Sequence, residues 1–194
     1  MEMRDEFIGY YRQYIKRDGA DRLLQWISET DFFSAPASTR FHSSYEGGLL
    51  EHSLNVFRNL ISRYPDGRGY PPESLAICGL LHDLCKVEFY KVSYRNMKND
   101  STGSWERVAY YTIDERFPYG HGEKTVFLIE RHMRLTEDEA LAIRWHMGGF
   151  DQDAKAGGYS VSAAFSRLPL AVMLHVADLE ATYLTETSGR KNGK

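Results

Sequence analysis

The chain has 194 residues, 42% of them hydrophobic and 26% charged, with a formal net charge of −3 at pH 7. This length suffices for one domain with a sizeable core. The slightly acidic balance argues against dependence on nonspecific nucleic-acid phosphate contacts and favours a small phosphorylated substrate. No apolar run approaches the roughly 20 residues that span a bilayer, and the N-terminus lacks the apolar centre of a signal peptide. We therefore expect a cytoplasmic protein with no membrane partner.

Two helices are predicted within residues 5–30. Apolar and aromatic residues recur at helical spacing over residues 6–16 and again over 21–30, with a break at Asp18-Gly19. Both helices are expected to be structural. Residues 32–47 are rich in Ser, Pro and Gly, which indicates a loop.

A third helix is predicted from about Gly48, and its apolar face includes His52. A fourth is predicted over residues 75–86, almost wholly apolar except for the adjacent His82 and Asp83. Leaving this pair without partners would cost several kcal/mol. A divalent metal would satisfy it, and so would a hydrogen bond between the two. The two cysteines, Cys78 and Cys85, are expected to be reduced core thiols.

A β-hairpin is predicted within residues 88–113, where polar and apolar residues alternate around a turn. It interleaves tyrosines and Trp105 with cations such as Arg95, a composition suited to stacking on a base and contacting phosphates. A hairpin that packs its aromatics on its own domain, or in a homo-oligomer, is an alternative.

Two further histidines begin and end predicted helices. His121 stands between two glycines at a helix start, with Glu123 and Lys124 in the first turn, and His132 is expected to be an exposed cation at that helix's end. A capping box at Thr136 opens a helix that carries His146 on its buried side. Residues 148–160 are predicted to be a surface loop or a lid.

The last helix is predicted from about Ser162 and carries Asp178 on an Ala-rich apolar face, where a carboxylate needs a partner. His175, one turn earlier, is expected behind the ligands or packed at the surface. Nitrogen and oxygen donors without thiolates suit one or two ions of Mn, Fe, Co, Ni or Zn. The proposed ligand set is His52, His82, Asp83, His121, His146 and Asp178.

The chain resembles the HD-domain metal-dependent phosphohydrolase superfamily. Four sequence strings carry this resemblance: FHSSYEGGLLEHSLNV, GLLHDLCK, GHGEK and LHVAD. They are most similar to the HD domain of bacterial 3′→5′ exoribonucleases and small phage or prophage relatives, over residues 40–185. The resemblance implies an all-α HD-domain helical bundle, here with the inserted hairpin. It implies one domain over residues 1–194, with a metal-binding core at 40–185. The exoribonucleases carry an additional nucleic-acid-binding domain, for which the residues before 40 are too few.

By this resemblance, His52, His82, Asp83 and Asp178 hold one metal, and Asp83 bridges to a second held by His121 and His146. The implied reaction is phosphoester hydrolysis of a nucleotide or nucleotide-like substrate by metal-activated water, with Mn or Fe favoured; short single-stranded nucleic acid is a further candidate. Catalytic roles are predicted for Asp83, Lys86 and Glu123. Substrate contacts are predicted for His42, Lys86, Arg95, Lys124 and Trp145.

Two alternatives stay open from the sequence. A diiron oxygenase of the same fold uses a similar set of six ligands, although the YEGGLLEHS stretch favours a hydrolase. A noncatalytic nucleotide sensor could retain the metals as structural elements.

Overall fold

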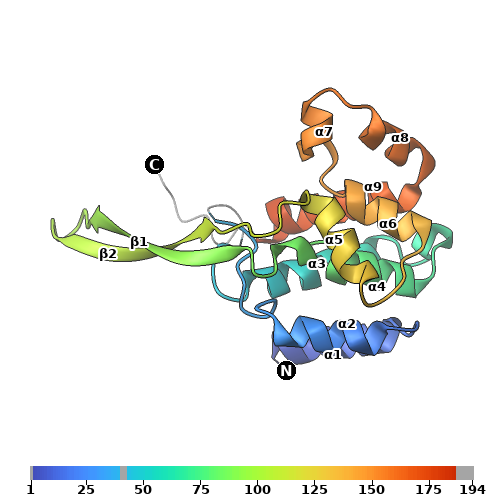
Figure 1. The fold of residues 1–194 in the computed structure, drawn as a ribbon, viewed down its shortest axis with the longest axis horizontal. Helices are drawn as coiled ribbons and strands as arrows, with labels where there is room; N and C mark the ends of the chain where they lie inside the picture. The colour runs from blue at the N-terminus through green and yellow to red at the C-terminus, as the bar shows by residue number, and fades with distance from the viewer. Residues whose placement is uncertain (1, 40–42, 187–194) are drawn as a thin grey trace.

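The computed structural model describes residues 2–39 and 43–186, which form a mostly helical molecule with one two-stranded antiparallel sheet (Figure 1). The predicted helical fold with an inserted hairpin is therefore confirmed. The helices are α1 (Met3–Tyr14), α2 (Ala20–Glu29), α3 (Gly48–Arg63), α4 (Pro72–Leu81), α5 (His121–Glu130), α6 (Glu137–Trp145), α7 (Gln152–Lys155), α8 (Ser160–Arg167) and α9 (Pro169–Glu180). Short turns are η1 (Gly67–Gly69), η2 (Leu84–Lys86), η3 (Gly148–Phe150) and η4 (Ala181–Thr185), and the strands are β1 (Tyr90–Lys98) and β2 (Trp105–Ile113).

The core forms around α3 and α4, which pack against each other and contact α1, α6 and α9 (Figure 1). Gly79 permits this packing, because a Cβ there would lie 2.7 Å from the Phe57 Cα of α3. Gly122 plays the same part between α5 and α6, since its Cβ would lie 2.3 Å from the carbonyl oxygen of Arg144. These two close approaches bring the helix ends that carry histidines toward one point.

Two predicted helices have wrong boundaries, and one predicted loop contains short helices. The helix expected over residues 75–86 ends at Leu81, because Asp83 leaves helical geometry (φ −109°, ψ 19°) and a separate turn, η2, follows. The helix expected from about Ser162 is two helices, α8 and α9, bent by 108° where Pro169 starts a new helix. Residues 148–160 include the turn η3 and the short helix α7.

The prediction for His132 was also wrong. It lies after the end of α5, half-buried, with its ring stacked on Trp26 at a centroid distance of 5.2 Å. Burial, together with the nearby cations of Arg131 and Arg22, lowers the pKa of His132. The side chain is therefore a neutral packing residue at pH 7 and not an exposed cation.

The hairpin extends away from the helical body (Figure 1), with Tyr90 opposite Ile113 at its base and Lys98 opposite Trp105 near its turn. Its surface carries exposed aromatics, including Trp105 at 71% exposure. Guanidinium groups lie over tyrosine rings, Arg95 over Tyr110 and Arg107 over Tyr94 at 5.0 and 4.3 Å. Aromatic and cationic side chains therefore alternate along the arm, as its sequence indicates.

Within residues 2–39 and 43–186, no single helix is both long and apolar enough to cross a membrane. The bent pair of α8 with the segment Pro169–Thr185 meets the criteria of length and composition only when the two are taken together.

Candidate metal centre

Six side chains from five helical segments converge in the structure. His52 comes from α3, His82 and Asp83 from the end of α4, and His121 from the start of α5. His146 follows the last residue of α6, and Asp178 comes from α9. These residues form overlapping groups whose potential ligand atoms lie within 4.8 Å of one another. The residues predicted as metal ligands are thus brought together in one place.

Asp83 joins two pairs of histidines. Its Oδ2 lies 3.6 Å from Nε2 of both His52 and His82. Its Oδ1 lies 3.0 Å from Nε2 of His121 and 3.7 Å from Nε2 of His146. Asp178 adds Oδ1 to the first pair, 3.2 Å from Nε2 of His52. The geometry therefore contains two donor clusters that share one buried carboxylate.

The ends of α4 and α6 orient two of these histidines in the same way. Nδ1 of His82 donates to the carbonyl oxygen of Gly79 at 3.1 Å, and Nδ1 of His146 donates to that of Ile143 at 2.7 Å. A neutral imidazole has only one N–H, so this hydrogen bond leaves the Nε2 lone pair facing the cluster. Backbone carbonyls that fix histidine tautomers in this way are typical of metal-ligating histidines.

In their neutral form, the rings present acceptors to the interior of the cluster. The Nε2 atoms of His52 and His82 are 3.3 Å apart, and those of His121 and His146 are 3.2 Å apart. The buried Oδ1 of Asp83 has no hydrogen bond of good geometry in the described part of the chain. One proton on a ring can serve only one of these acceptors, whereas a divalent cation serves several at once. The donor set therefore fits one or two metal ions.

The titratable side chains of the cluster have widely different pKa values. Burial lowers the pKa of His82 to about 3, so this ring is neutral at pH 7. Burial also opposes the charged form of His52, but hydrogen bonds to Asp178 and Glu186 raise its pKa to about 10. Burial would raise the pKa of Asp83, yet Lys86 and the histidines hold it well below its usual range. Metal binding at this site would therefore displace protons from the rings.

Lys86 and Asp83 form the closest ion pair of the site, with Nζ 2.7 Å from Oδ2. Burial opposes the ammonium, but Asp83 raises the pKa of Lys86 above its ordinary value, so the side chain stays charged. Lys86 lines a cavity of about 590 Å³ together with His52, Asp83, His121 and Asp178. The site is therefore open to a small molecule and carries a cation beside the shared carboxylate.

The walls of this cavity come from distant segments. Apolar side chains are contributed by Ile113 of β2, Phe150 of η3 and Leu179 of α9, and Lys155 of α7 adds a second cation. His175 also lines the cavity, and its Nδ1 donates to the carbonyl oxygen of His146 at 2.6 Å. His175 thus holds the segment that carries His146.

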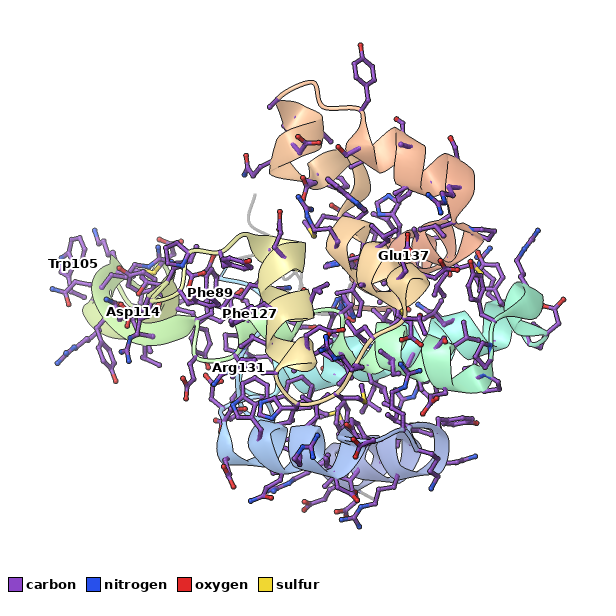
Figure 2. All side chains as sticks on the ribbon, turned by 45° about the vertical axis from the view of Figure 1, so that its right-hand side comes forward. Phe89, Trp105, Asp114, Phe127, Arg131 and Glu137 are labelled. Carbon is purple, nitrogen blue, oxygen red and sulfur yellow. The ribbon has the colours of Figure 1, made fainter. Side chains whose placement is uncertain are left out.

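Four of the residues predicted to act in catalysis or substrate binding do not line this cavity: Glu123, Lys124, Arg95 and Trp145. Glu123 pairs with Arg144, whose guanidinium also stacks on Trp145 at 3.7 Å. Lys124 is buried beside Glu115, with Nζ 5.2 Å from the ring centre of Phe89, which lies where the hairpin joins the body (Figure 2). Arg95 lies on the hairpin. His42 is outside the described residues.

Glu186 is a buried residue of the site that the sequence analysis missed. Its side chain is 1% exposed, and its Oε1 lies 3.0 Å from Nδ1 of His52. A glutamate near the polar C-terminal end of the chain gives no local signal of burial. Its only sequence clue is its position eight residues after Asp178, on the continuation of the same helix.

Comparisons with known proteins assign the chain to no family. No family model, no curated protein and no solved structure matches it significantly. The resemblance to HD-domain phosphohydrolases stays a prediction from the sequence motifs.

Proposed function

We propose that the protein is a metal-dependent phosphohydrolase of the HD-domain type that cleaves a phosphoester of a nucleotide or nucleotide-like substrate. One observation carries the proposal: the two oxygens of Asp83 face different histidine pairs, beside a cavity that also holds Lys86. A carboxylate shared between two clusters is an arrangement suited to a pair of metal ions that clamp a phosphoryl group.

In this proposal, His52, His82, Asp83 and Asp178 hold one ion, and Asp83, His121 and His146 hold the other. Bound ions of this kind supply Lewis acidity and activate water for attack on phosphorus. The chain itself orients the ligand rings through Gly79, Ile143 and Glu186. It also excludes bulk water from the buried side of the centre, because His52, His82, Asp83 and His146 are at most 3% exposed.

Lys86 is the protein's own contribution to charge stabilisation. Its ammonium stands beside Asp83 on the cavity wall, where it can donate to a phosphoryl oxygen as negative charge develops there. Lys155, on the same cavity, can bind a second anionic group of the substrate. The apolar walls suit the organic part of a phosphoester, such as a base.

The test is a product screen on protein loaded in turn with Mn²⁺, Fe²⁺, Co²⁺ or Zn²⁺. Nucleoside mono- and triphosphates, cyclic dinucleotides and short RNA are offered, and products are identified by mass spectrometry. We expect phosphate, triphosphate or a mononucleotide to be released, and no release from the Asp83→Asn variant. Metal-loaded protein that turns over none of these substrates would contradict the proposal.

The apolar residues of the cavity, Ile113, Phe150 and Leu179, also favour a second candidate, a diiron oxygenase of an apolar organic substrate. Dioxygen uptake by the iron-loaded protein, without release of phosphate from any substrate, would select that function. Tight nucleotide binding without any product would indicate a sensor.

A further inference from the structure

The carboxylate of Glu186 is surrounded by hydrogen-bond donors. Nδ1 of His52 lies 3.0 Å from Oε1 and 3.2 Å from Oε2. The Asn55 amide nitrogen lies 3.1 Å from Oε1, and the Ser43 hydroxyl lies 3.0 Å from Oε2. The group is therefore buried with at least three donors from segments more than 130 residues away.

The surrounding network sets the direction of these hydrogen bonds. The amide oxygen of Asn55 accepts from Arg58 at 3.1 Å, so the amide nitrogen must be the atom that points at Glu186. Arg58 is itself held by both carboxylate oxygens of Glu6 at 2.6 Å. An ionised carboxylate only accepts, and His52, Asn55 and Ser43 each offer it a donor.

This direction determines which nitrogen of His52 faces the metal centre. Because Glu186 accepts from Nδ1, the hydrogen on Nδ1 is fixed on the side away from the cluster. Nε2 then points at Asp178, Asp83 and His82, at 3.2, 3.6 and 3.3 Å. In His82 and His146, Nδ1 donates to a backbone carbonyl oxygen instead. His52 therefore differs from them in having a charged partner on Nδ1.

The backbone after α9 explains how Glu186 reaches this place. In a continuous α-helix, a residue eight positions after Asp178 lies about 80° around the axis from it. The segment Ala181–Thr185 forms a π turn, whose longer hydrogen-bonded loop winds less per residue than an α turn. Both carboxylates therefore face α3 and contact opposite nitrogens of the same imidazole ring.

We infer that Glu186 is a positioning residue of the metal centre, which holds the His52 ring in the orientation and tautomer that present Nε2 to a metal ion. The inference rests on the proposed metal centre but is independent of the bond that the centre cleaves. A carboxylate behind a ligating histidine also makes the ring a stronger ligand, and loss of such a partner typically weakens metal binding 10- to 100-fold.

The experiment measures the Kd of Zn²⁺ and Mn²⁺ by competition with a fluorescent chelator, so it needs no substrate. The Glu186→Gln variant keeps the size of the side chain but places an amide where three donors converge. We expect its Kd to rise 10- to 100-fold while its circular dichroism spectrum is unchanged. A Kd within twofold of the wild type would overturn the inference.

Glu180→Gln is the matched control. Glu180 lies six residues earlier on the same C-terminal segment, and its carboxylate pairs with Arg63 of α3 rather than with a ligand. We expect the Kd of this variant to stay within twofold of the wild type. An equal rise in Kd in both variants would show that removing any contact between α3 and the C-terminal segment weakens metal binding. That result would overturn the assignment to Glu186.

A measurement on the wild type covers the case in which Glu186→Gln does not fold. In the Zn²⁺-loaded protein, ¹⁵N NMR of the histidine rings reports which nitrogen of each ring carries hydrogen. We expect His52 to be protonated at Nδ1, with a strongly deshielded hydrogen, and metal-bound at Nε2. A His52 ring bound through Nδ1 or protonated at Nε2 would contradict the inference, whatever reaction the protein catalyses.

Discussion

Each histidine of the proposed metal centre has a specific partner on its outward-facing nitrogen. Gly79 and Ile143 offer backbone carbonyls to His82 and His146, Glu186 offers a carboxylate to His52, and the Cys85 sulfur lies 3.3 Å from Nδ1 of His121. The side chains are thus pre-oriented before any ion binds, which reduces the entropy lost on binding.

Asp83→Asn tests the shared carboxylate. The amide has nearly the same shape, but it removes the negative charge that both histidine pairs face, so we expect bound metal to fall to the background of the buffer. Inductively coupled plasma mass spectrometry after dialysis measures this. Asp114→Asn, at a half-buried carboxylate that follows β2 and pairs with Lys91, should leave the metal content unchanged.

Lys86→Met tests the cation beside the cluster. If Lys86 stabilises charge on the phosphoryl group, we expect kcat to fall about 10²- to 10³-fold while bound metal is retained. Steady-state kinetics on the substrate found in the product screen measures it, with Lys91→Met on the exposed hairpin as the control. An unchanged kcat would remove Lys86 from the catalytic machinery.

At the scale of elements, helix ends build the candidate centre, and a partly buried ion pair holds two of the helices in place. The Arg17 guanidinium binds both oxygens of Glu139 at 2.7 and 2.8 Å, and Ser74 of α4 donates to the same carboxylate at 2.6 Å. Glu139 also completes the capping box of α6 with Thr136. One side chain therefore ties the α1–α2 connection to α4 and α6.

Glu139→Gln should lower the free energy of unfolding by about 2 kcal/mol at pH 7, because Arg17 loses two charge-assisted hydrogen bonds and keeps Glu73 as its carboxylate partner. Burial opposes the charged form of Glu139, but Arg17, Ser74 and Thr136 lower its pKa below the ordinary value of 4.5. The stabilisation is thus complete above pH 4.5 and is lost as the pH falls through the lowered pKa.

Urea unfolding at several pH values between 7 and 3 measures this effect. The difference in stability between wild type and variant should shrink as the pH falls. A difference that is constant over this range would contradict the assignment to the carboxylate.

The hairpin should be separable from the body. Beyond its base, the described strand residues pair only with one another, and an isolated two-stranded sheet adds little stability of its own. Replacing residues 93–110 by Asn-Gly keeps Val92 opposite Tyr111 and closes a two-residue turn. We expect the free energy of unfolding to change by less than about 1 kcal/mol and bound metal to be unchanged.

The same variant tests the predicted role of the arm in binding. If its aromatics and cations contact nucleic acid, KM should rise for short RNA but not for a mononucleotide. Loss of folding or of metal would instead show that the arm is part of the core.

At the scale of the whole molecule, the ligands connect α3, α4, α5, α6 and α9, so a bound ion should stabilise the fold as one unit. A ligand present at about 1,000 times its Kd stabilises the native state by about 4 kcal/mol, which corresponds to a rise in Tm of roughly 10 °C for a chain of this size. Differential scanning calorimetry with EDTA and then with excess Mn²⁺ or Zn²⁺ measures it. An unchanged Tm with every metal tested would argue against a native-state metal site.

Local patterns in the sequence determined the helices, the hairpin and the candidate ligands. Helical spacing of apolar residues and β alternation depend on neighbours a few positions away, so they can be recognised without the fold. The candidate ligands were found because each is a polar residue on a face that is otherwise apolar, or at the start of a helix, as His121 is. Such local signals identify residues that need a partner.

Only the tertiary structure decided which partners these residues have. Glu186 meets His52 across 134 positions of the chain, and the ring of His132 stacks on Trp26 from another helix. The close packing of α4 on α3 at Gly79 likewise joins segments that are far apart in the chain. Contacts between distant segments leave no periodic trace in the sequence, because they depend on how the helices pack and not on the spacing within any one of them.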